Sequence, residues 1–239
     1  MMAHNVDTTE LVPIVEADAA QIAAAGPSRP ALAFGLRVLP GQLHLVHSRD
    51  PVRSEVLADA LLGLTPASRG AIAFNGEDWR RLPGDTAFNR RRIVGRVPGR
   101  GGWMETRSVM DNVLLPMRHH TLLPDATLRT AASDIARRFG LPGLPLQLPG
   151  RCAEADLRRA ACVRAFLGRP TLVILEHPSG RGDPDLLSPL IDAIQQVRRR
   201  RGAVIWLTEH EALLRDHGIP ADHRHRIVGA ELRTWEEQT

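Results

Sequence analysis

Short continuous apolar runs recur along the chain and predict buried strands. The clearest are Thr171–Leu175 and Ala203–Thr208, and a shorter run covers Gln42–Val46. Such runs are typical of the central strands of a parallel sheet, where both faces are covered. Ala31–Leu39 alternates partly between apolar and polar residues, and Gly70–Gly76 also resembles a strand.

Apolar residues at helical spacing predict helices between these strands. The first, Glu55–Leu62, ends just before Gly63, and glycine commonly follows the last residue of a helix. Further helices are predicted over Leu128–Phe139, Ala155–Leu167 and Pro184–Arg199. Strands that alternate with helices indicate an α/β fold with a mostly parallel sheet.

The predicted organisation is one α/β domain over residues 29–239, preceded by residues 1–28. We expect residues 1–28, which are acidic and then Ala-rich, to form a loose lead-in or a first edge strand. The N-terminus lacks the apolar segment of a signal peptide, and no stretch reaches the roughly 18 consecutive apolar residues of a membrane span. These features predict a cytoplasmic protein that reaches a membrane only through a partner.

Arginine alone supplies the positive charge of the chain. The 239 residues carry a formal net charge of +4, and all 31 Lys and Arg residues are arginine. This exclusive use of arginine has two explanations: biased codon usage, or a basic surface that binds anionic lipid or nucleic acid. The run Arg198–Arg201 suits the negative end of a helix dipole, and we expect it to be solvated. Because lysine is absent, mechanisms that need a lysine at a phosphate are excluded.

Five stretches resemble motifs of the ATP-binding-cassette (ABC) family, in the family's order and with similar spacing. They are GLTPASRGAIAFNGEDWRRLP (63–83), SVMDNVLLPMR (108–118), LRRAACVRAFLGRPTLVILEHP (157–178), SGRGDP (179–184) and VIWLTEH (204–210). The resemblance covers about residues 30–233. It implies a P-loop NTPase (RecA-like) fold with a mostly parallel sheet core, an antiparallel β subdomain and a helical subdomain at about 100–165. The segment NVLLPMRHHTLLPDATLR also resembles the ATPase subunits of Mla-type, MCE-linked phospholipid transporters.

The resemblance places a phosphate-binding loop between the first buried strand and the helix after it. Such a loop reads G-x-x-x-x-G-K-[ST]: backbone N–H groups surround the phosphates, the lysine bridges them, and the hydroxyl holds Mg²⁺. The aligned residues are His47, Val52, Arg53 and Ser54. Only the hydroxyl is retained. Pro51 removes an N–H, and Asp50 brings a carboxylate to the position of the phosphate oxygens.

The other positions that handle ATP in the family have changed as well. The Walker B strand ends in Glu176 and His177 where the family has Asp-Glu, and the γ-phosphate glutamine falls near Pro98-Gly99. Glu176 could still reach a metal, and His177 could act as a base. The equivalent of the signature motif is Cys152, Ala153, Glu154, Ala155 and Asp156; the switch histidine aligns with Glu209, with His210 one position on, and the D-loop Asp183 is retained.

We therefore expect a degenerate ABC ATPase-like subunit of a membrane transporter that does not hydrolyse ATP and acts in assembly or regulation. The resemblance implies two partners, an integral-membrane permease docked near residues 99–120 and a second ATPase-like chain. It implies phospholipid as the cargo and a position peripheral to the inner membrane. No cofactor is expected, neither ATP nor Mg²⁺, and no metal site, because His119–His120 and Asp222–His225 match no known ligand spacing.

Two alternatives stay open. One is a divergent but working ATPase in which Arg53, Ser54, Glu176 and His177 substitute for the lost residues. The other is a stand-alone regulator that uses its arginines to bind nucleic acid, and steep salt dependence would favour it. Aromatic residues make up only 4% of the chain and do not interleave with the arginines. Nucleic acid is therefore not the expected partner.

Overall fold

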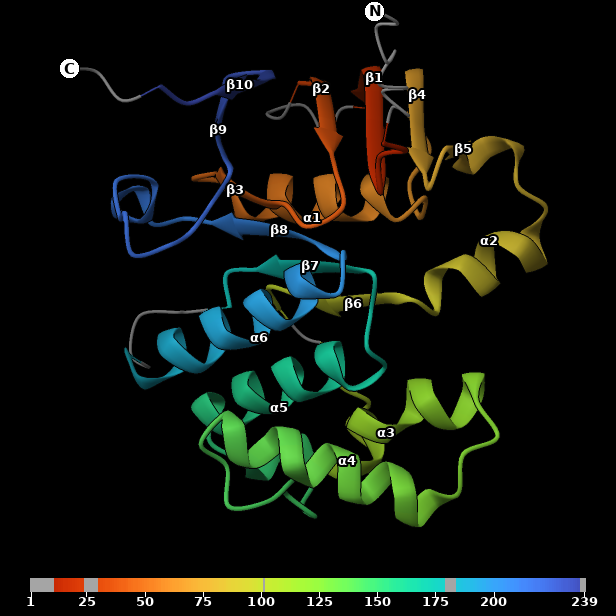
Figure 1. The fold of residues 1–239 in the computed structure, drawn as a ribbon, viewed down its shortest axis with the longest axis vertical. Helices are drawn as coiled ribbons and strands as arrows, with labels where there is room; N and C mark the ends of the chain where they lie inside the picture. Colours follow the sequence, from red (N-terminus) through yellow and green to blue (C-terminus); the bar gives the residue numbers. More distant parts are fainter. Residues whose placement is uncertain (1–10, 24–29, 101, 179–183, 237–239) are drawn as a thin grey trace, which may run out of the picture.

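The computed structural model describes residues 11–23, 30–100, 102–178 and 184–236. The strands of this part are β1 (Val15–Ile22), β2 (Leu32–Val38), β3 (Leu43–His47), β4 (Arg69–Phe74), β5 (Glu77–Asp78), β6 (Val94–Val97), β7 (Leu172–Glu176), β8 (Ala203–Thr208), β9 (His223–Val228) and β10 (Glu231–Thr234). They form one ten-stranded sheet in the order β5-β4-β1-β2-β10-β9-β3-β8-β7-β6. Figure 1 shows its two parts, with β1, β2 and β4 at the top and β6, β7 and β8 across the middle.

The helices are α1 (Pro51–Leu61), α2 (Gly84–Arg91), α3 (Val109–His120), α4 (Asp125–Arg138), α5 (Glu154–Leu167) and α6 (Leu187–Arg199). Short 3₁₀ turns are η1 (Trp79–Arg81), η2 (Pro149–Arg151), η3 (Pro184–Leu186) and η4 (Glu211–Leu214). Among the described residues, no helix has both the length and the apolar character needed to cross a membrane.

The sheet combines a parallel part with an antiparallel part. Strands β9, β3, β8, β7 and β6 pair in parallel, and β1 pairs antiparallel with β2 and β4. The buried runs became parallel strands because the sheet is covered on both faces. The predicted α/β fold, with a mostly parallel core and an antiparallel β part, is confirmed.

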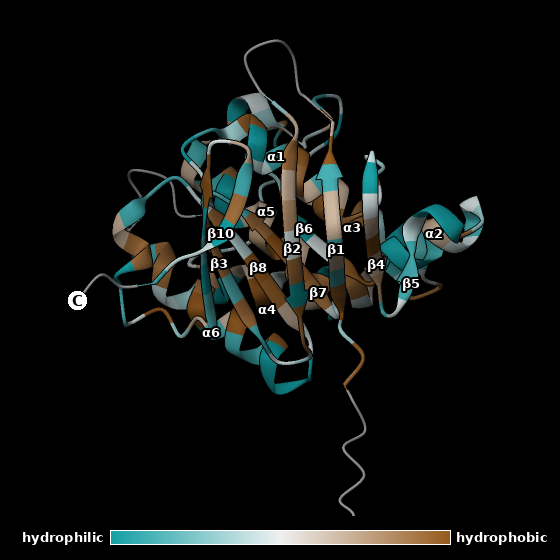
Figure 2. Cartoon of the chain, turned by 90° about the horizontal axis from the view of Figure 1, so that it is seen from above, coloured by the Kyte–Doolittle hydropathy of each residue, from teal (hydrophilic) through white to brown (hydrophobic). Residues whose placement is uncertain are grey.

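Two apolar cores lie on opposite sides of the parallel strands. On one side, α1 lies between the parallel and the antiparallel strands, and Leu57 and Leu61 pack there among residues of both. On the other side, α3, α4, α5 and α6 pack in layers, with Trp206 among the residues they bury. Figure 2 shows apolar residues concentrated in the strands and polar residues in α2 and β5. The strand ends are thereby fixed from both sides.

Two glycines are required by close backbone contacts. A Cβ at Gly95 on β6 would lie 2.0 Å from the carbonyl oxygen of Ala165 on α5, so only glycine lets the helix approach the strand. A Cβ at Gly70 would lie 2.2 Å from the carbonyl oxygen of Ala19, and its φ is +68°. Ala19 is at an irregularity of β1, where the register with β2 and β4 shifts.

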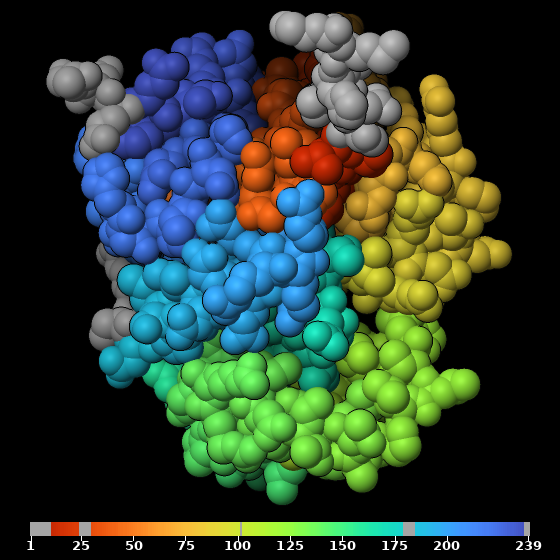
Figure 3. Space-filling view, in the orientation of Figure 1, coloured from red at the N-terminus to blue at the C-terminus, as the bar shows by residue number. Residues whose placement is uncertain are grey.

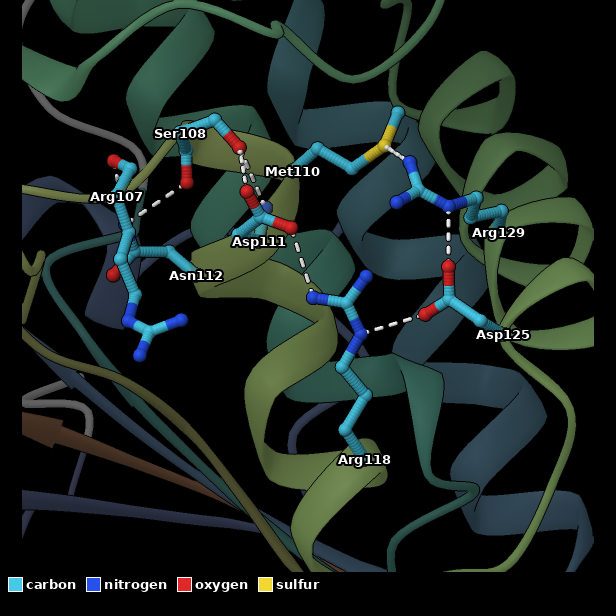
Figure 4. Close-up of polar contacts among 8 residues, drawn as sticks. All are labelled: Arg107, Ser108, Met110, Asp111, Asn112, Arg118, Asp125 and Arg129. Atoms are coloured by element: carbon cyan, nitrogen blue, oxygen red, sulfur yellow. Dashed lines mark hydrogen bonds and ion pairs between the residues drawn. The ribbon is translucent and has the colours of Figure 1, made fainter.

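The helical region begins with a chain of polar contacts in the stretch SVMDNVLLPMR (Figure 4). Ser108 caps α3, because its Oγ accepts the N–H of Asp111 at 3.0 Å and donates to the Asp111 carboxylate at 2.6 Å. Arg118 then bridges Asp111 and Asp125, at 2.8 and 2.6 Å, and Arg129 also binds Asp125. These residues set the position of α3 against α4.

The structure differs from the sequence prediction in several elements. Residues 15–22 form strand β1 between β2 and β4, so this part of the predicted lead-in is neither loose nor an edge strand. The predicted boundary at residue 28 lies outside the described residues. Helix α1 begins at Pro51, four residues earlier than predicted. The sequence patterns also gave no sign of β5, β6, β9, β10 and α2, which are short or polar.

Candidate functional site

The predicted site residues at three strand ends lie together at one edge of the sheet. β3 ends at His47, β7 ends at Glu176, and β8 ends just before Glu209. These strands are parallel and adjacent, in the order β3-β8-β7, so their carboxyl ends meet at the same edge. His177 follows β7, and the charges of Glu209 and His210 act on its ring. Ligands of open α/β sheets bind at this kind of edge.

The loop after β3 is shorter than the predicted loop, which extended to Ser54. Because α1 begins at Pro51, only residues 48–50 connect strand and helix. Asp50 caps the helix, and its Oδ1 accepts the N–H of Val52 at 3.0 Å. The positive end of the helix dipole stabilises that carboxylate. The chain's own anion therefore occupies the helix start, where a phosphate loop offers its N–H groups to nucleotide.

The loop residues that kept hydrogen-bonding chemistry contact the protein's own backbone. Ser54 is 0% exposed, and its Oγ lies 3.5 Å from the carbonyl oxygen of Asp50. Arg53 donates from Nη2 to the carbonyl of Pro30 at 3.4 Å. A hydroxyl buried in the first turns of its own helix is not placed to coordinate an ion in front of the loop.

Glu176, the residue predicted to replace the Walker B aspartate, has a cation of the same chain as its partner. Glu176 is 2% exposed, and its Oε1 accepts from Nε of Arg96 on β6 at 2.6 Å. The same guanidinium donates from Nη1 to Asp59 on α1, also at 2.6 Å. Burial raises the pKa of Glu176, while Arg96 and the backbone N–H of Gly99 oppose that shift. Arg96 thus binds the carboxylate that holds Mg²⁺ in the family.

His177, predicted at the position of the family's catalytic glutamate, has an unusual backbone conformation. Its φ is +50°, a left-handed value that side chains with a Cβ seldom adopt. Both ring nitrogens are buried and make no hydrogen bond within the described chain. Burial lowers the pKa of His177, so the ring is neutral at neutral pH. Gly99 lies against it, because a Cβ there would be 3.3 Å from the ring.

A hollow of about 390 Å³ lies between the short loop and the end of β9. Arg49, Arg53 and Arg226 are among its lining residues. Glu211 pairs with Arg49 at 3.1 Å and with Arg226 at 2.5 Å, and both bonds lower its pKa. Nη1 of Arg53 and Nε of Arg226 are buried without a hydrogen bond inside the described ranges. The hollow is basic, but a carboxylate of the chain already neutralises part of it.

The signature-equivalent residues lie in the helical part. Cys152 follows η2, and its Sγ lies 3.5 Å from the carbonyl oxygen of Leu148. Glu154 starts α5 and pairs with Arg158 one turn later. The hydrogen bonds of Cys152 and Glu154 stay within the helical part. The D-loop residue Asp183 lies outside the described residues.

Three residues of this site had not been singled out from the sequence: Arg96, Asp59 and Glu211. The one available signal was a charged residue, Arg96, between apolar neighbours in a short stretch that precedes the glutamine position. Nothing in the sequence indicates which carboxylate it would meet.

The residues at this edge do not fit Mg²⁺-ATP held in the family's manner. The helix start is capped by Asp50, the hydroxyl of Ser54 is buried, and Glu176 is paired with Arg96. Across the described ranges, no group of three or more His, Cys, Asp or Glu side chains has an arrangement that could hold a metal ion.

Comparison with solved structures identifies the fold of the chain. No protein-family model matches the chain. A dimeric ATP-binding cassette, solved in a post-hydrolysis state with ADP and phosphate, superimposes with a TM-score of 0.80 over 94% of this chain and 99% of that chain, at 14% identity. The ATP-binding subunit of an ABC transporter gives a TM-score of 0.74 over 92% and 88%, at 17% identity. The chain therefore has the fold of an ABC nucleotide-binding domain.

The relatives found by sequence are ATP-binding proteins of transport systems. The chain is 24% identical to the intermembrane phospholipid transport ATP-binding protein MlaF of Haemophilus influenzae, over 74% of this chain and 67% of that protein. It is 29% identical to the nickel import ATP-binding protein NikE of Pseudomonas putida, over 75% of this chain and 70% of that protein. The chain is thus a homologue of the ATP-binding subunits of ABC transporters, and Mla-type subunits are among its relatives.

Proposed function

We propose that this chain is an ABC ATPase-like subunit that does not hydrolyse ATP and acts in the assembly or regulation of a membrane transporter. The ion pair between Glu176 and Arg96 carries this proposal, because it involves the carboxylate that the reaction would need for Mg²⁺. Exchange of Arg96 for Mg²⁺ would break one of the two ion pairs of a half-buried guanidinium and leave it only Asp59, which is unfavourable.

The second support is that the chain supplies its own substitutes for both charges of Mg²⁺-ATP. The Asp50 carboxylate takes the place of a phosphate at the start of α1, and the Arg96 guanidinium takes the place of the metal beside Glu176. Each charge has a partner in the protein, so the folded site does not depend on nucleotide for its charge balance. A subunit of this kind is stable without nucleotide.

The proposed partners follow from the family. They are an integral-membrane permease and a second ATPase-like chain, with the subunit on the cytoplasmic side of the inner membrane. The proposed cargo is phospholipid, which rests on the relationship to a protein named for phospholipid transport. Exposed Phe88, which contacts His119 and His120 of α3, together with exposed Leu122 and Leu123, offers an apolar surface beside residues 99–120.

Equilibrium binding of a fluorescent ATP analogue with Mg²⁺ to the purified chain tests the proposal. An intact family ATPase serves as the positive control. We expect no saturable binding up to millimolar nucleotide, and no release of phosphate above the rate without protein. The variant Arg53→Ala is measured in parallel.

Micromolar saturable binding that is lost in Arg53→Ala would favour the divergent ATPase instead. The specific observation behind that alternative is the basic hollow, where Arg53 and Arg226 keep guanidinium N–H groups without partners. The neutral ring of His177 would then be the candidate base, and His177→Ala would abolish turnover. Absence of binding by both the wild type and Arg53→Ala supports the non-hydrolysing subunit.

The permease surface has its own test. Leu122→Asp should abolish co-purification with the cognate permease, because it places a charge on the apolar surface. Leu146→Asp changes another exposed leucine, which is 72% exposed against 103% for Leu122, and should leave co-purification intact. Loss in both variants, or in neither, would contradict docking at residues 99–120.

A further inference from the structure

A groove of about 510 Å³ lies between α4, α6 and the C-terminal end of α5. Its floor is formed by Phe139 and Phe166, whose ring centroids are 5.9 Å apart, and by Leu167, all three buried. Ile135 on α4 and Ala193 on α6 are half-buried and form its sides. Figures 1 and 3 show α6 and α4 one above the other on the same face of the molecule.

Three arginines stand around this apolar floor: Arg138 at the end of α4, Arg169 just after α5, and Arg200 just after α6. All three are exposed, and within the described residues none of them forms an ion pair. Arg138 donates one hydrogen bond, to the side-chain oxygen of Gln196 at 3.3 Å. Burial and the charge of Arg169 lower the pKa of Arg200, so the two guanidiniums repel each other.

The two acidic residues of the groove offset only part of this charge, because they stand among three arginines. Asp134 and Asp192 also line it, and Asp134 is paired with Arg137, which lies outside the groove. Asp192 forms no ion pair with any part of the chain that the structure describes. Two neighbouring cations without carboxylate partners beside buried aromatic rings form an arrangement that an anion with an apolar tail would complement.

We propose that this groove binds an anionic amphiphile, namely a carboxylate on an unbranched apolar chain. The carboxylate would accept hydrogen bonds from Arg169 and Arg200, because planar guanidiniums match carboxylate oxygens in geometry and charge. The tail would cover Phe139 and Phe166 and remove apolar surface from water. The volume of the groove lies within the range of small-molecule pockets, about 300–1,000 Å³.

A small ligand fits the groove better than a helix of a partner protein. A bound helix needs a continuous apolar strip with anchors on successive turns. Here the apolar floor is confined to the ends of α4 and α5, and the cations stand close around it. Binding of an acidic helix is therefore an outcome of the test and not the expected result.

Isothermal titration of the full chain with sodium dodecanoate, kept below the concentration at which it forms micelles, tests the site. We expect saturable one-to-one binding in the micromolar range. The double variant Arg169→Asn/Arg200→Gln should weaken binding by about tenfold or more. Asparagine is chosen because Arg169 has a φ of +49°, which asparagine tolerates.

Arg199→Gln is the matched control, because Arg199 is an exposed neighbour that does not line the groove. The Arg199→Gln variant should bind dodecanoate within about twofold of the wild type, as expected for a solvent-screened charge that does not line the groove. Ala193→Phe fills the groove and leaves the arginines in place, and it should also abolish binding. Acetate and the neutral amphiphile dodecyl maltoside should both bind at least about tenfold more weakly than dodecanoate, since each lacks one half of the ligand. Thermal unfolding of each variant verifies that it folds.

Several results would overturn the assignment. One is the absence of saturable dodecanoate binding. Another is equal weakening by Arg199→Gln and by the double variant, which would indicate diffuse attraction to a basic surface. A third is binding of an acidic amphipathic peptide where dodecanoate fails, which would assign the groove to a protein. The ATP experiment is independent of all three, because Arg169, Arg200 and Ala193 lie outside the strand-end site.

Discussion

The strand-end site and the groove between α4 and α6 differ in whether their arginines are paired with carboxylates of the chain. At the strand ends, Arg96 lies between Glu176 and Asp59, and Asp50 caps its own helix. In the groove, Arg169 and Arg200 repel each other, and within the described chain neither has a carboxylate partner. Where the chain supplies its own counter-ions, an external ligand must first break those ion pairs. Where it supplies none, the free energy of pairing is left for a ligand.

Removal of Arg96 should have the largest effect, because it leaves Glu176 buried without a cation. We expect Arg96→Ala to lower the free energy of unfolding by about 3–5 kcal/mol, measured by urea denaturation. The double variant Arg96→Met/Glu176→Met removes both charges and should cost less than the single change. Arg80→Ala breaks the more exposed pair with Asp78 and should cost much less than Arg96→Ala. Equal effects of Arg96→Ala and Arg80→Ala would show that the strand-end pair does not stabilise the fold.

Two buried histidines, His44 and His225, avoid an unpaired buried charge in another way, because both rings are neutral in the folded protein. Nδ1 of His44 and Nε2 of His225 are 3.1 Å apart. Burial, together with the charges of His225 and His223, lowers the pKa of His44 to about 3, and burial with the charge of His223 lowers the pKa of His225 to about 4. Both values lie below 6.5, so below pH 6.5 the unfolded chain binds more protons than the folded chain. Stability should therefore fall as pH falls from 6.5 towards 4, with about 2 kcal/mol lost per histidine by pH 5.

Urea denaturation at pH 7.5 and pH 5 measures this loss. The variant His44→Gln/His225→Gln should have a smaller difference between the two pH values than the wild type. His217→Gln, which changes an exposed histidine, should keep the wild-type difference. A difference that persists in the double variant would assign the acid sensitivity to other groups.

Asp50 gives a smaller effect, because it caps a helix at the surface. Asp50→Ala should cost about 1 kcal/mol, since the N–H of Val52 loses its acceptor. Asp50→Asn keeps an acceptor oxygen and should cost less. If both variants were as stable as the wild type, the carboxylate would not be the partner that the helix start depends on, and denaturation curves decide this.

The sequence predicts those elements in which every side chain follows one hydrophobic pattern. β7 and β8 are apolar up to their last residues, Glu176 and Thr208, because both faces are buried. β6 reads Val-Gly-Arg-Val and is interrupted by two residues that serve tertiary contacts: Gly95 admits Ala165, and Arg96 reaches Glu176. β1 carries polar residues and a bulge, and its pairing on both sides becomes visible only with β2 and β4 in place.

The same limit applies to the site. The carboxylate of Asp50 was predicted at the phosphate position, because strand, loop and helix are contiguous in sequence. The partner of Glu176 was not predicted, because Arg96 lies 80 residues away and only the parallel pairing of β6 with β7 brings them together. Local motifs therefore located the strand ends, whereas the ion pairs that replace ligand contacts depend on strand order.

The smallest effect on stability should come from Arg200, at the groove. This guanidinium has no ion-pair partner among the described residues and is repelled by Arg169. Arg200→Gln should therefore change the free energy of unfolding by no more than about 0.5 kcal/mol, and in the stabilising direction. Dodecanoate should make the wild type more stable than the double variant. At ten times its dissociation constant it should stabilise the wild type by about 1.4 kcal/mol and leave Arg169→Asn/Arg200→Gln nearly unchanged. A large loss of stability in Arg200→Gln without ligand would mean that the arginine is already paired, and the two regions would no longer differ.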